Sequence, residues 1–448
     1  MNDAHSTRPA KLAAKFAAKM TNCHAEADGS QERSRGCRRC RRKRRARTFV
    51  SVLSSISAML CASATRAQNS APPAIQLWSI ESLQNALERY HGRPDQPDPD
   101  IAHLLADARA AMQRPIGSVM EKKTFPPSGD KHDYMSVAIY FWPDPTKRDG
   151  LPYINRDGVR NESLKTEFPD ADNLEKMMRG VATLAPAAFI SGDSNFADKA
   201  VQALRIWFVD PATRINPNLQ FAQARPGRDA GTPQGTIEIH WLPDFLDSIK
   251  LLESMGALND GEKDAMHSWM REFLAWLRTS KQGVAAAHLP NNIGTYYDAD
   301  VVGLALFCGD VALAKSALDK TKTTRIAAQI SSDGQQPLET ERTKGLGYSI
   351  FNLEALMTLA RYGESAGVDL WNYRGPRGGS IKAAIDFIAP FAVREKQWPL
   401  KQIEDYNPQN FVSLLYRARK VYGEAPYAKY WNELPAQPRT ADRCHIVY

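Results

Sequence analysis

The sequence contains little cysteine, and beyond residue 67 it has neither a long apolar run nor an excess of positive charge. Four of the six cysteines precede residue 62, which leaves Cys308 and Cys444 in the rest of the chain. These two either form one disulfide in an oxidising compartment or stay free, since Cys308 lies in an apolar helical pattern. No run of about 18 apolar residues follows residue 67, so no membrane-spanning helix is expected there.

The positive charge is concentrated at the N-terminus. Residues 1–49 contain 14 Lys and Arg against 4 Asp and Glu, and Arg66 adds one more positive charge. Of the formal net charge of +8, the chain from Gln68 onward therefore carries −3. A mildly acidic body does not provide a general surface for nucleic acid, so no nucleic-acid partner is expected. An acidic ligand would need a local cluster of cations.

Motifs for metals, nucleotides and serine hydrolases are also missing. Beyond residue 67 the histidines are scattered, and no H-E-x-x-H, paired C-x-x-C or Asp-rich calcium loop occurs. No nucleotide fingerprint and no G-x-S-x-G are found. We therefore expect no metal and no organic cofactor.

The first 67 residues are typical of a basic leader with a secretory signal peptide. A basic run at Arg38–Arg47 precedes the short apolar segment Phe49–Cys61, and small residues that suit cleavage follow. This pattern predicts a periplasmic or secreted protein without membrane insertion after the signal is removed. The alternative is that Arg38–Arg47 is a nuclear or nucleic-acid-binding patch. A linker is expected at 68–79, one domain at 80–435 and a tail at 436–448.

Helical periodicity dominates the domain and predicts an all-α fold. Three breaks share a glycine followed by an acid, at Gly192-Asp193, Gly309-Asp310 and Gly363-Glu364. Glycine can end a helix in the left-handed conformation and the acid can begin the next one, so these breaks indicate stacked α-hairpins. With no fixed short repeat, a closed toroid or irregular array is favoured over an open solenoid. The expected helices cover residues 80–90, 101–112, 172–190, 195–208, 243–255, 262–278, 301–307, 311–318, 350–361, 381–393 and 411–421.

Three segments interrupt the helical pattern and are rich in side chains able to bind a ligand. Residues 124–161 contain many Pro, Gly, Asp and aromatic residues, and the segment is too long for a simple connector. Within it, Met135–Trp142 is the best candidate for a strand. The other two, Asn291–Asp298 and Glu341–Ser349, lie just before predicted helices and combine amides, phenols and cations.

Several motifs in these segments and between them occur in a characteristic order. They are Ser128-Gly129-Asp130-Lys131-His132-Asp133-Tyr134, Trp142-Pro143-Asp144-Pro145, Arg156-Asp157-Gly158, Asp210-Pro211-Ala212-Thr213-Arg214, Asn291-Asn292-Ile293-Gly294 and Arg342-Thr343 with Tyr348-Ser349. In this order they resemble the alginate lyase family of bacterial polysaccharide lyases, over about residues 80–400. The resemblance implies an incomplete (α/α) toroid built from stacked α-hairpins.

The resemblance also implies β-elimination at a uronic acid, so that an acidic polysaccharide, alginate or another uronan, is the expected partner. Tyr348 matches the family's catalytic tyrosine, Arg342 the arginine that accompanies it, and Asn292 the amide that neutralises the substrate carboxylate. Asn291 is a second amide donor for the substrate. These types suit the chemistry, since a base must remove the C5 proton, an acid must protonate O4, and charge develops on the carboxylate.

The sequence departs from the family at two positions that commonly hold histidine, which here are Ile293 and Gly347. In one interpretation Tyr348 acts as both base and acid, and His240 is either the replacement imidazole or a structural residue. In the other, the protein has lost catalysis and only binds the glycan. Further candidates for substrate contact are Lys131, His132, Tyr140, Trp142, Tyr297 and Arg225. A hydrolase would need two carboxyl groups, for which Glu339 and Glu341 are available without an evident partner.

Overall fold

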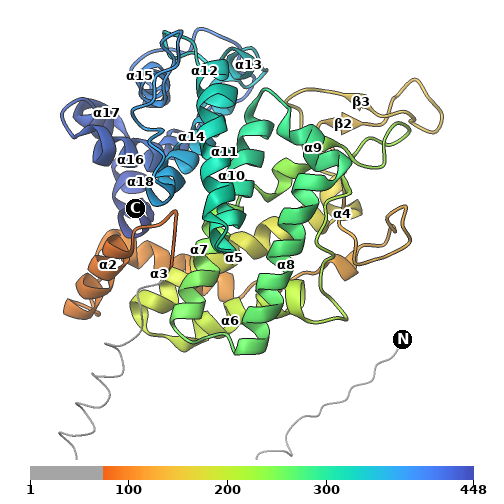
Figure 1. Ribbon diagram of the computed structural model, residues 1–448, viewed down its shortest axis with the longest axis horizontal. Helices are drawn as coiled ribbons and strands as arrows, with labels where there is room; N and C mark the ends of the chain where they lie inside the picture. The colour runs from red at the N-terminus through yellow and green to blue at the C-terminus, as the bar shows by residue number, and fades with distance from the viewer. Residues whose placement is uncertain (1–73) are drawn as a thin grey trace, which may run out of the picture. The chain divides into compact units, whose positions relative to one another are not determined.

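Helices make up most of residues 74–448, the part of the chain that the computed structural model describes (Figure 1). The all-α prediction is confirmed. The N-terminal leader, the signal peptide and the first part of the linker lie outside the described residues. Within residues 74–448, no helix has the length and apolar character needed to cross a membrane. The helices are α2 (Ile80–Gly92), α3 (Pro99–Met112), α4 (Leu164–Glu167), α5 (Asp170–Ser191), α6 (Ser194–Leu204), α7 (Leu242–Ser254), α8 (Asp260–Thr279), α9 (Lys281–Ala287), α10 (Asn292–Phe307), α11 (Val311–Thr321), α12 (Ala327–Gln329), α13 (Pro337–Thr340), α14 (Gly345–Ala366), α15 (Ile381–Ala392), α16 (Val412–Tyr422), α17 (Ala428–Glu433), α18 (Ala436–Ala441) and α19 (Cys444–Val447).

Consecutive helices pack as hairpins around a central series of helices. Helix α5 packs against α6, α10 against α11 and α14 against α15, while α5, α7, α10 and α14 contact one another in that order. Helix α10 is buried on almost every side, which suits its apolar composition. The N-terminal ends of α10 and α14 hold the two polar stretches that the sequence singled out.

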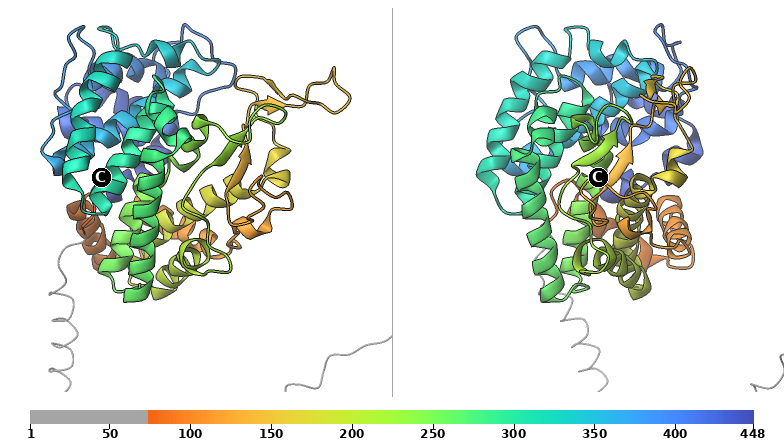
Figure 2. Two further views of the ribbon diagram at one scale, coloured as in Figure 1. Left: turned by 45° about the vertical axis from the view of Figure 1, so that its right-hand side comes forward. Right: turned by 90° about the vertical axis from the view of Figure 1, so that its right-hand side faces the viewer.

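Four short strands lie beside the helices. Strands β1 (Met135–Val137) and β4 (Phe221–Ala224) pair in parallel, and β2 (Phe141–Trp142) pairs antiparallel with β3 (Ile154–Asn155). We call residues 138–161, which contain the β2–β3 pair, the hairpin arm; its tip extends away from the helices (Figure 2). The prediction of extended structure at Met135–Trp142 is confirmed, although it divides into two strands that belong to different pairs.

Two helices begin earlier than the sequence predicted. Helix α10 begins at Asn292 and α14 at Gly345, where helices were expected from residues 301 and 350. Asn292 and Tyr348 therefore belong to first helical turns and not to loops. The polar residues of these turns face a pocket, so the apolar spacing that reveals a helix is absent there.

Two of the three predicted glycine breaks are confirmed and one is wrong. Gly192 and Gly309 have φ of 71° and 81°, and the acids that follow them cap the next helices. Helix α14 instead continues through Gly363 to Ala366, and Gly367, whose φ is 70°, caps its C-terminal end. Gly363 is needed for close packing, because a Cβ there would collide with the carbonyl oxygen of Val368.

Both ends of the described chain extend the packed body beyond the predicted domain. Leu77 and Trp78 are buried, and their backbone N–H groups donate to Asp247 at 2.8 and 2.7 Å. At the other end α19 is buried, and the carbonyl of Val447 accepts from Ser79 N at 2.7 Å. Residues 76–79 and 436–448 thus pack against the body. Cys308 and Cys444 are both free.

Candidate active site

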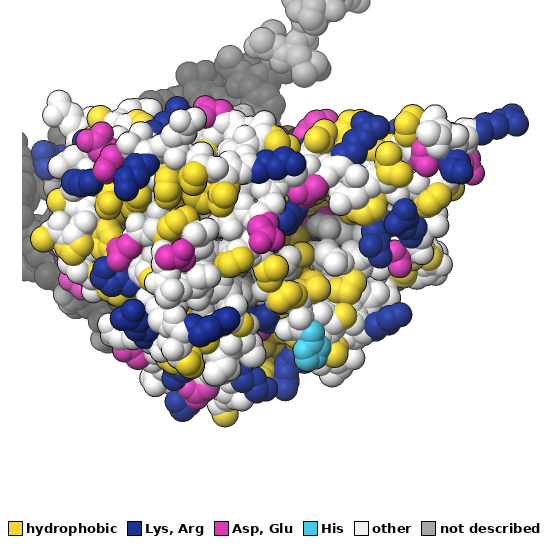
Figure 3. All heavy atoms as spheres, turned by 90° about the horizontal axis from the view of Figure 1, so that it is seen from above, with side chains coloured by type: hydrophobic (Ala, Val, Ile, Leu, Met, Phe, Trp, Pro, Cys, Tyr) yellow, Lys and Arg dark blue, Asp and Glu magenta, His cyan; other side chains and the backbone are white. Residues whose placement is uncertain are grey.

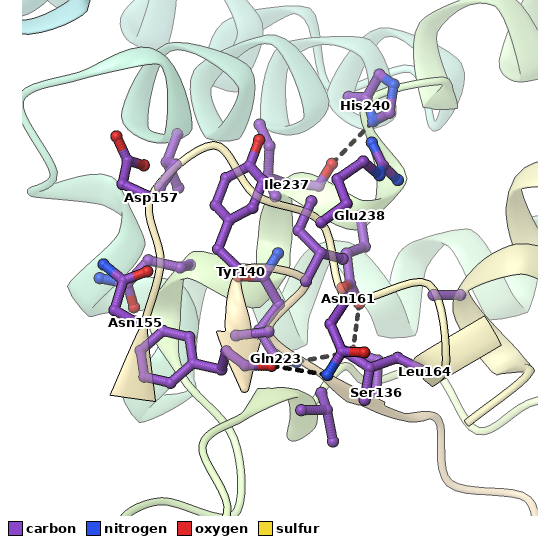
Figure 4. A pocket seen from close by; sticks show the side chains of 18 of the residues that line it. Ser136, Tyr140, Asn155, Asp157, Asn161, Leu164, Gln223, Ile237, Glu238 and His240 are labelled. Atoms are coloured by element: carbon purple, nitrogen blue, oxygen red, sulfur yellow. Dashed lines mark hydrogen bonds between the residues drawn. The ribbon is translucent and has the colours of Figure 1, made fainter. Parts of the chain in front are cut away.

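A pocket of about 710 Å³ opens between the hairpin arm, η3 (Pro233–Ile239) and the first turns of α10 and α14. Six of the residues predicted to act on substrate line this pocket together: Tyr348, Arg342, Asn292, Asn291, His240 and Tyr140. In the view of Figure 4, Asp157 and Asn155 of the arm lie toward one end of the pocket and His240 toward the other, with Tyr140 between them. Four segments far apart in the sequence therefore supply one site.

Tyr348 is held by an arginine and a second tyrosine. The Arg342 guanidinium lies over the ring of Tyr348, 3.9 Å from its centroid, and the Tyr348 hydroxyl donates to the Tyr140 hydroxyl at 2.8 Å. Burial raises the pKa of Tyr348 well above its usual value and Tyr140 raises it further, while Arg342 acts in the opposite direction. Tyr348 is therefore a neutral phenol here, with a cation positioned to stabilise its phenolate.

Arg342 is fixed from the arm. Its Nη2 donates to Oδ1 of Asp157 at 2.6 Å, and the Thr343 hydroxyl donates to Oδ2 at 2.8 Å. Burial alone would raise the pKa of Asp157, but the bonds from Arg342 and Thr343 outweigh it and hold that pKa below the usual value. Asp157 is thus an ionised partner for the arginine.

A buried glutamate, Glu339, holds Asn292 in place. The backbone N–H and the Nδ2 of Asn292 donate to the two oxygens of Glu339, each at 2.6 Å. Glu339 is only 1% exposed, and burial raises its pKa although Asn292 counteracts this. A buried amide network supports the same helix turn, with bonds among Thr295, Gln329, Gln336 and Asn352.

His240 lies deeper in the pocket among aromatic rings. It contacts Phe351 and Tyr296 edge-on, at centroid distances of 5.3 and 5.8 Å. Burial lowers the pKa of His240, and its Nδ1 bonds to the Ile237 carbonyl at 3.0 Å. Its imidazole is therefore neutral, with Nδ1 as the donor and Nε2 as an acceptor. Phe351, which His240 contacts, follows Tyr348 by three residues, so His240 packs against the helical turn of α14 next to Tyr348.

Glu238 is a partly buried carboxyl group that lines the pocket. The hydroxyls of Tyr134 and Ser136 both donate to its Oε2 at 2.6 Å, while its Oε1 is buried without a partner among residues 74–448. Burial raises the pKa of Glu238 to about 7. Ser136 also accepts from Gln223 N at 2.8 Å, so this carboxyl group ties together β1, β4 and η3.

A family model described as alginate lyase matches residues 118–398. The crystal structure of an alginate lyase from Bacteroides ovatus shares 34% sequence identity with the chain, with a TM-score of 0.78 over 83% of this chain and 98% of that one. The chain belongs to the alginate lyase family. It is a polysaccharide lyase, and the predicted (α/α) toroid is confirmed.

A second solved structure extends this likeness of fold. Alginate lyase A1-III from Sphingomonas species A1 is 15% identical, with a TM-score of 0.50 over 85% of this chain and 97% of that one. No curated protein sequence gives a significant match.

At the two positions where the alginate lyase family commonly has histidine, this chain lines the pocket with apolar surface or open space. Ile293 and Gly347 both line it, and a Cβ added to Gly347 would meet no atom within 4 Å. Leu289, Ile237 and Phe351 continue the apolar wall. A side chain at 347 would therefore enter the pocket next to Tyr348, and position 293 offers no proton donor or acceptor.

Five predicted substrate-binding residues of the lyase do not line this pocket. Lys131 lies over the ring of Phe125, Nδ1 of His132 bonds to the Arg214 carbonyl at 2.6 Å, and Arg225 pairs with Asp229. Trp142 donates from Nε1 to the Val159 carbonyl and stacks against Arg156, so it holds the arm. Tyr297 is buried and donates to the Leu277 carbonyl at 3.2 Å, and burial raises its pKa to about 12.

Asp157, Glu339 and Glu238 are parts of this site that sequence reasoning did not identify. Asp157 stands in the quoted Arg156-Asp157-Gly158 motif, and an acid next to glycine in a long polar segment was the available signal. Glu339 was considered only for a hydrolase, yet both of its oxygens are bonded to Asn292. Figure 3 shows lysine, arginine and acidic side chains mixed across one face of the lyase.

Proposed function

We propose that this lyase cleaves alginate or a related polyuronate by β-elimination, without an organic cofactor, and that Tyr348 carries out the proton transfers. The observation that supports this most is the convergence of Tyr348, Arg342 and Asn292 on one pocket from separate segments of the chain. The similarity to the alginate lyase from Bacteroides ovatus supports the choice of substrate class.

Charge on the substrate carboxylate is taken up by amide and guanidinium groups. Removal of the C5 proton builds negative charge on the adjacent carboxylate, and donors fixed in advance stabilise that charge most effectively. Asn292 has a second Nδ2 hydrogen beyond the one bonded to Glu339, and Asn291 adds another amide. Arg342 uses Nη2 and Nε for Asp157, which leaves Nη1 for the uronate.

Tyr348 acts as base and then as acid on one face of the sugar. It accepts the C5 proton as a phenolate, stabilised by the Arg342 cation over its ring, and returns a proton to the departing O4. Because burial and the Tyr140 hydroxyl both raise its pKa, the phenolate is the scarce form of Tyr348, and the Arg342 cation over the ring is the group that favours it. His240, neutral and lining the same pocket, is the imidazole acceptor of the site.

The test is a panel of purified polyuronates, with the ultraviolet absorbance of the 4,5-unsaturated uronate as the signal. We expect at least one polymer to give this signal, and Tyr348→Phe to lower the rate by at least about a hundredfold without unfolding. The matched control is Tyr297→Phe, a buried tyrosine whose hydroxyl bonds only to a backbone carbonyl and does not line the pocket. Full activity in Tyr348→Phe would refute the assignment.

The second candidate function is glycan binding without cleavage, and the observation that favours it is the apolar surface at Ile293. In that case uronan binds to the wild-type protein with no unsaturated product, and Ile293→His recovers turnover. Measurable turnover by the wild type eliminates this candidate.

The last part of the proposal concerns location. A lyase acting on an extracellular polymer agrees with the leader at 1–67, and we propose a periplasmic or secreted protein. N-terminal sequencing of the mature protein from the periplasm or the medium tests this, since an intact N-terminus in the cytosol would contradict it.

A further inference from the structure

The hairpin arm contains one acid, Asp157, that contacts the segment carrying Arg342. Asp157 follows β3, and its carboxylate receives four donors from residues 342 and 343. Arg342 Nη2 lies 2.6 Å from Oδ1, and the Thr343 hydroxyl, Thr343 N and Arg342 Nε lie 2.8, 3.4 and 3.4 Å from Oδ2. These contacts span 185 and 186 positions of the sequence.

The backbone around Asp157 is built for this close approach. Gly158 has a φ of 81°, and a Cβ there would collide with the hydroxyl of Thr343. Arg156 N donates to the Tyr140 carbonyl at 2.8 Å, so the two sides of the arm are joined at its base. Tyr140 and Asp157 therefore reach Tyr348 and Arg342 as one unit.

We propose that Asp157 is a positioning residue of the lyase, which fixes Arg342 against the face of Tyr348 and directs Nη1 of Arg342 toward the uronate carboxylate. This inference rests on the proposed function. A carboxylate that accepts hydrogen bonds from two nitrogens of one guanidinium group fixes the plane of that group as well as its position. Within residues 74–448 no hydrogen bond from Nη1 is found, so that nitrogen stays available for substrate.

Asp157 also keeps Arg342 away from a competing carboxylate. Glu339 acts on Arg342 electrostatically, and Arg342 in turn lowers the pKa of Glu339. Both oxygens of Glu339 are occupied by Asn292. Without Asp157, Arg342 would turn toward Glu339, leave the ring of Tyr348 and compete with Asn292, so one substitution would disturb both the proton transfer and the carboxylate site.

The opposite interpretation is that Asp157 occupies the position on Arg342 where the substrate carboxylate binds, so that the substrate must displace it. The bonds from Thr343 argue against it, because they hold Asp157 independently of Arg342. The two interpretations predict opposite changes in binding. If the substrate must displace Asp157, removing the charge of Asp157 gives tighter binding of uronate. If Asp157 positions Arg342, removing it gives weaker binding of uronate and slower turnover.

The experiment compares Asp157→Asn, Asp157→Ala and Asp157→Glu, with Asp149→Ala as the matched control. Asp149 is an exposed acid of the same arm that does not line the pocket. On the polyuronate that the wild type cleaves, we expect kcat to fall about tenfold in Asp157→Asn and about a hundredfold in Asp157→Ala. Asp157→Glu should recover part of kcat, and the rising limb of the kcat–pH profile should move to higher pH in Asp157→Ala. The control should keep the wild-type kcat.

A second measurement separates this inference from the proposed function. In the Tyr348→Phe background, calorimetry with a uronate oligosaccharide should show binding at least about threefold weaker when Asp157→Ala is added. Wild-type kcat in Asp157→Ala, an unchanged pH profile with only a lower melting temperature, or tighter oligosaccharide binding would each overturn the role of Asp157. A wild-type protein that binds uronate but cleaves no polymer would refute the lyase proposal, and the calorimetric comparison would still decide the role of Asp157.

Discussion

The bond pair between Glu339 and Asn292 allows a quantitative test of how the carboxylate site is held. Glu339→Ala removes both acceptors of Asn292, whose backbone N–H and Nδ2 are bonded at 2.6 Å inside the protein. Asn292 is 3% exposed and Glu339 1%, so water cannot replace the lost acceptors without rearrangement. The substitution therefore leaves two buried donors unpaired at the start of α10.

The magnitude follows from the cost of such donors. Each unpaired buried donor costs about 1–3 kcal/mol, which gives roughly 2–6 kcal/mol for the pair. Burial raises the pKa of Glu339, so removing its charge recovers part of this, and we expect a net loss of about 3 kcal/mol. With an unfolding entropy of about 2 cal/mol/K per residue over the described 375 residues, this lowers the melting temperature by about 4 °C.

Thermal unfolding followed by circular dichroism measures this change, with Glu341→Ala as the matched control. Glu341 is an exposed glutamate two positions away, and its removal should move the melting temperature by less than about 1 °C. Uronate binding should weaken in Glu339→Ala and stay unchanged in the control. A melting temperature of Glu339→Ala within about 1 °C of the wild type would refute the reasoning.

Two further predictions concern the interior and the floor of the pocket. Burial raises the pKa of Glu238 to about 7, so the stability that its protonated form contributes is present below about pH 4.5 and is lost as the pH rises through about 7. Urea unfolding measures the free energy of unfolding, which for Glu238→Gln should rise by about 3 kcal/mol relative to the wild type between pH 4.5 and pH 8. If the difference in unfolding free energy between variant and wild type stays constant over this range, the prediction is wrong. Gly347→Ala should stabilise α14 by up to about 1 kcal/mol, because its Cβ meets no atom within 4 Å, and should lower kcat/KM by intruding beside Tyr348. Unchanged kcat/KM would mean that substrate does not occupy this space.

The helical architecture was predictable because it depends on local patterns. Apolar spacing located α5, α7 and α8 within two residues of their observed bounds, and the glycine–acid pairs at Gly192 and Gly309 located the turns within the α5–α6 and α10–α11 hairpins. Apolar spacing did not reveal the helical turns that line the pocket. The first turns of α10 and α14 present polar residues to the pocket, so no apolar periodicity marks them as helical.

The sequence identified the candidate catalytic residues but not the residues that hold them in place. Tyr348, Arg342 and Asn292 stand in recognisable motifs, whereas Asp157 and Glu339 act through contacts made only when distant segments meet. Trp142 and Arg225, predicted from their residue types to contact the sugar, bond instead to Val159 and Asp229 in their own loops and do not line the pocket. Residue type limits the chemistry available, and the fold decides which groups reach the pocket.

The departure at Ile293 has a consequence for how the reaction must run. An isoleucine side chain gives position 293 no proton to move, and Gly347 leaves open space beside Tyr348. In the proposed mechanism, proton transfer therefore falls to Tyr348 and the neutral His240, and charge stabilisation falls to Arg342, which Asp157 holds. Because only the phenolate of Tyr348 can remove the C5 proton and burial makes that phenolate scarce, turnover should depend on the Arg342 cation more steeply than in a lyase with an imidazole at position 293. A variant that supplies that imidazole, Ile293→His, should accordingly tolerate Asp157→Ala better than the wild type does, and equal losses in both backgrounds would show that Tyr348 does not rely on Arg342 in this way.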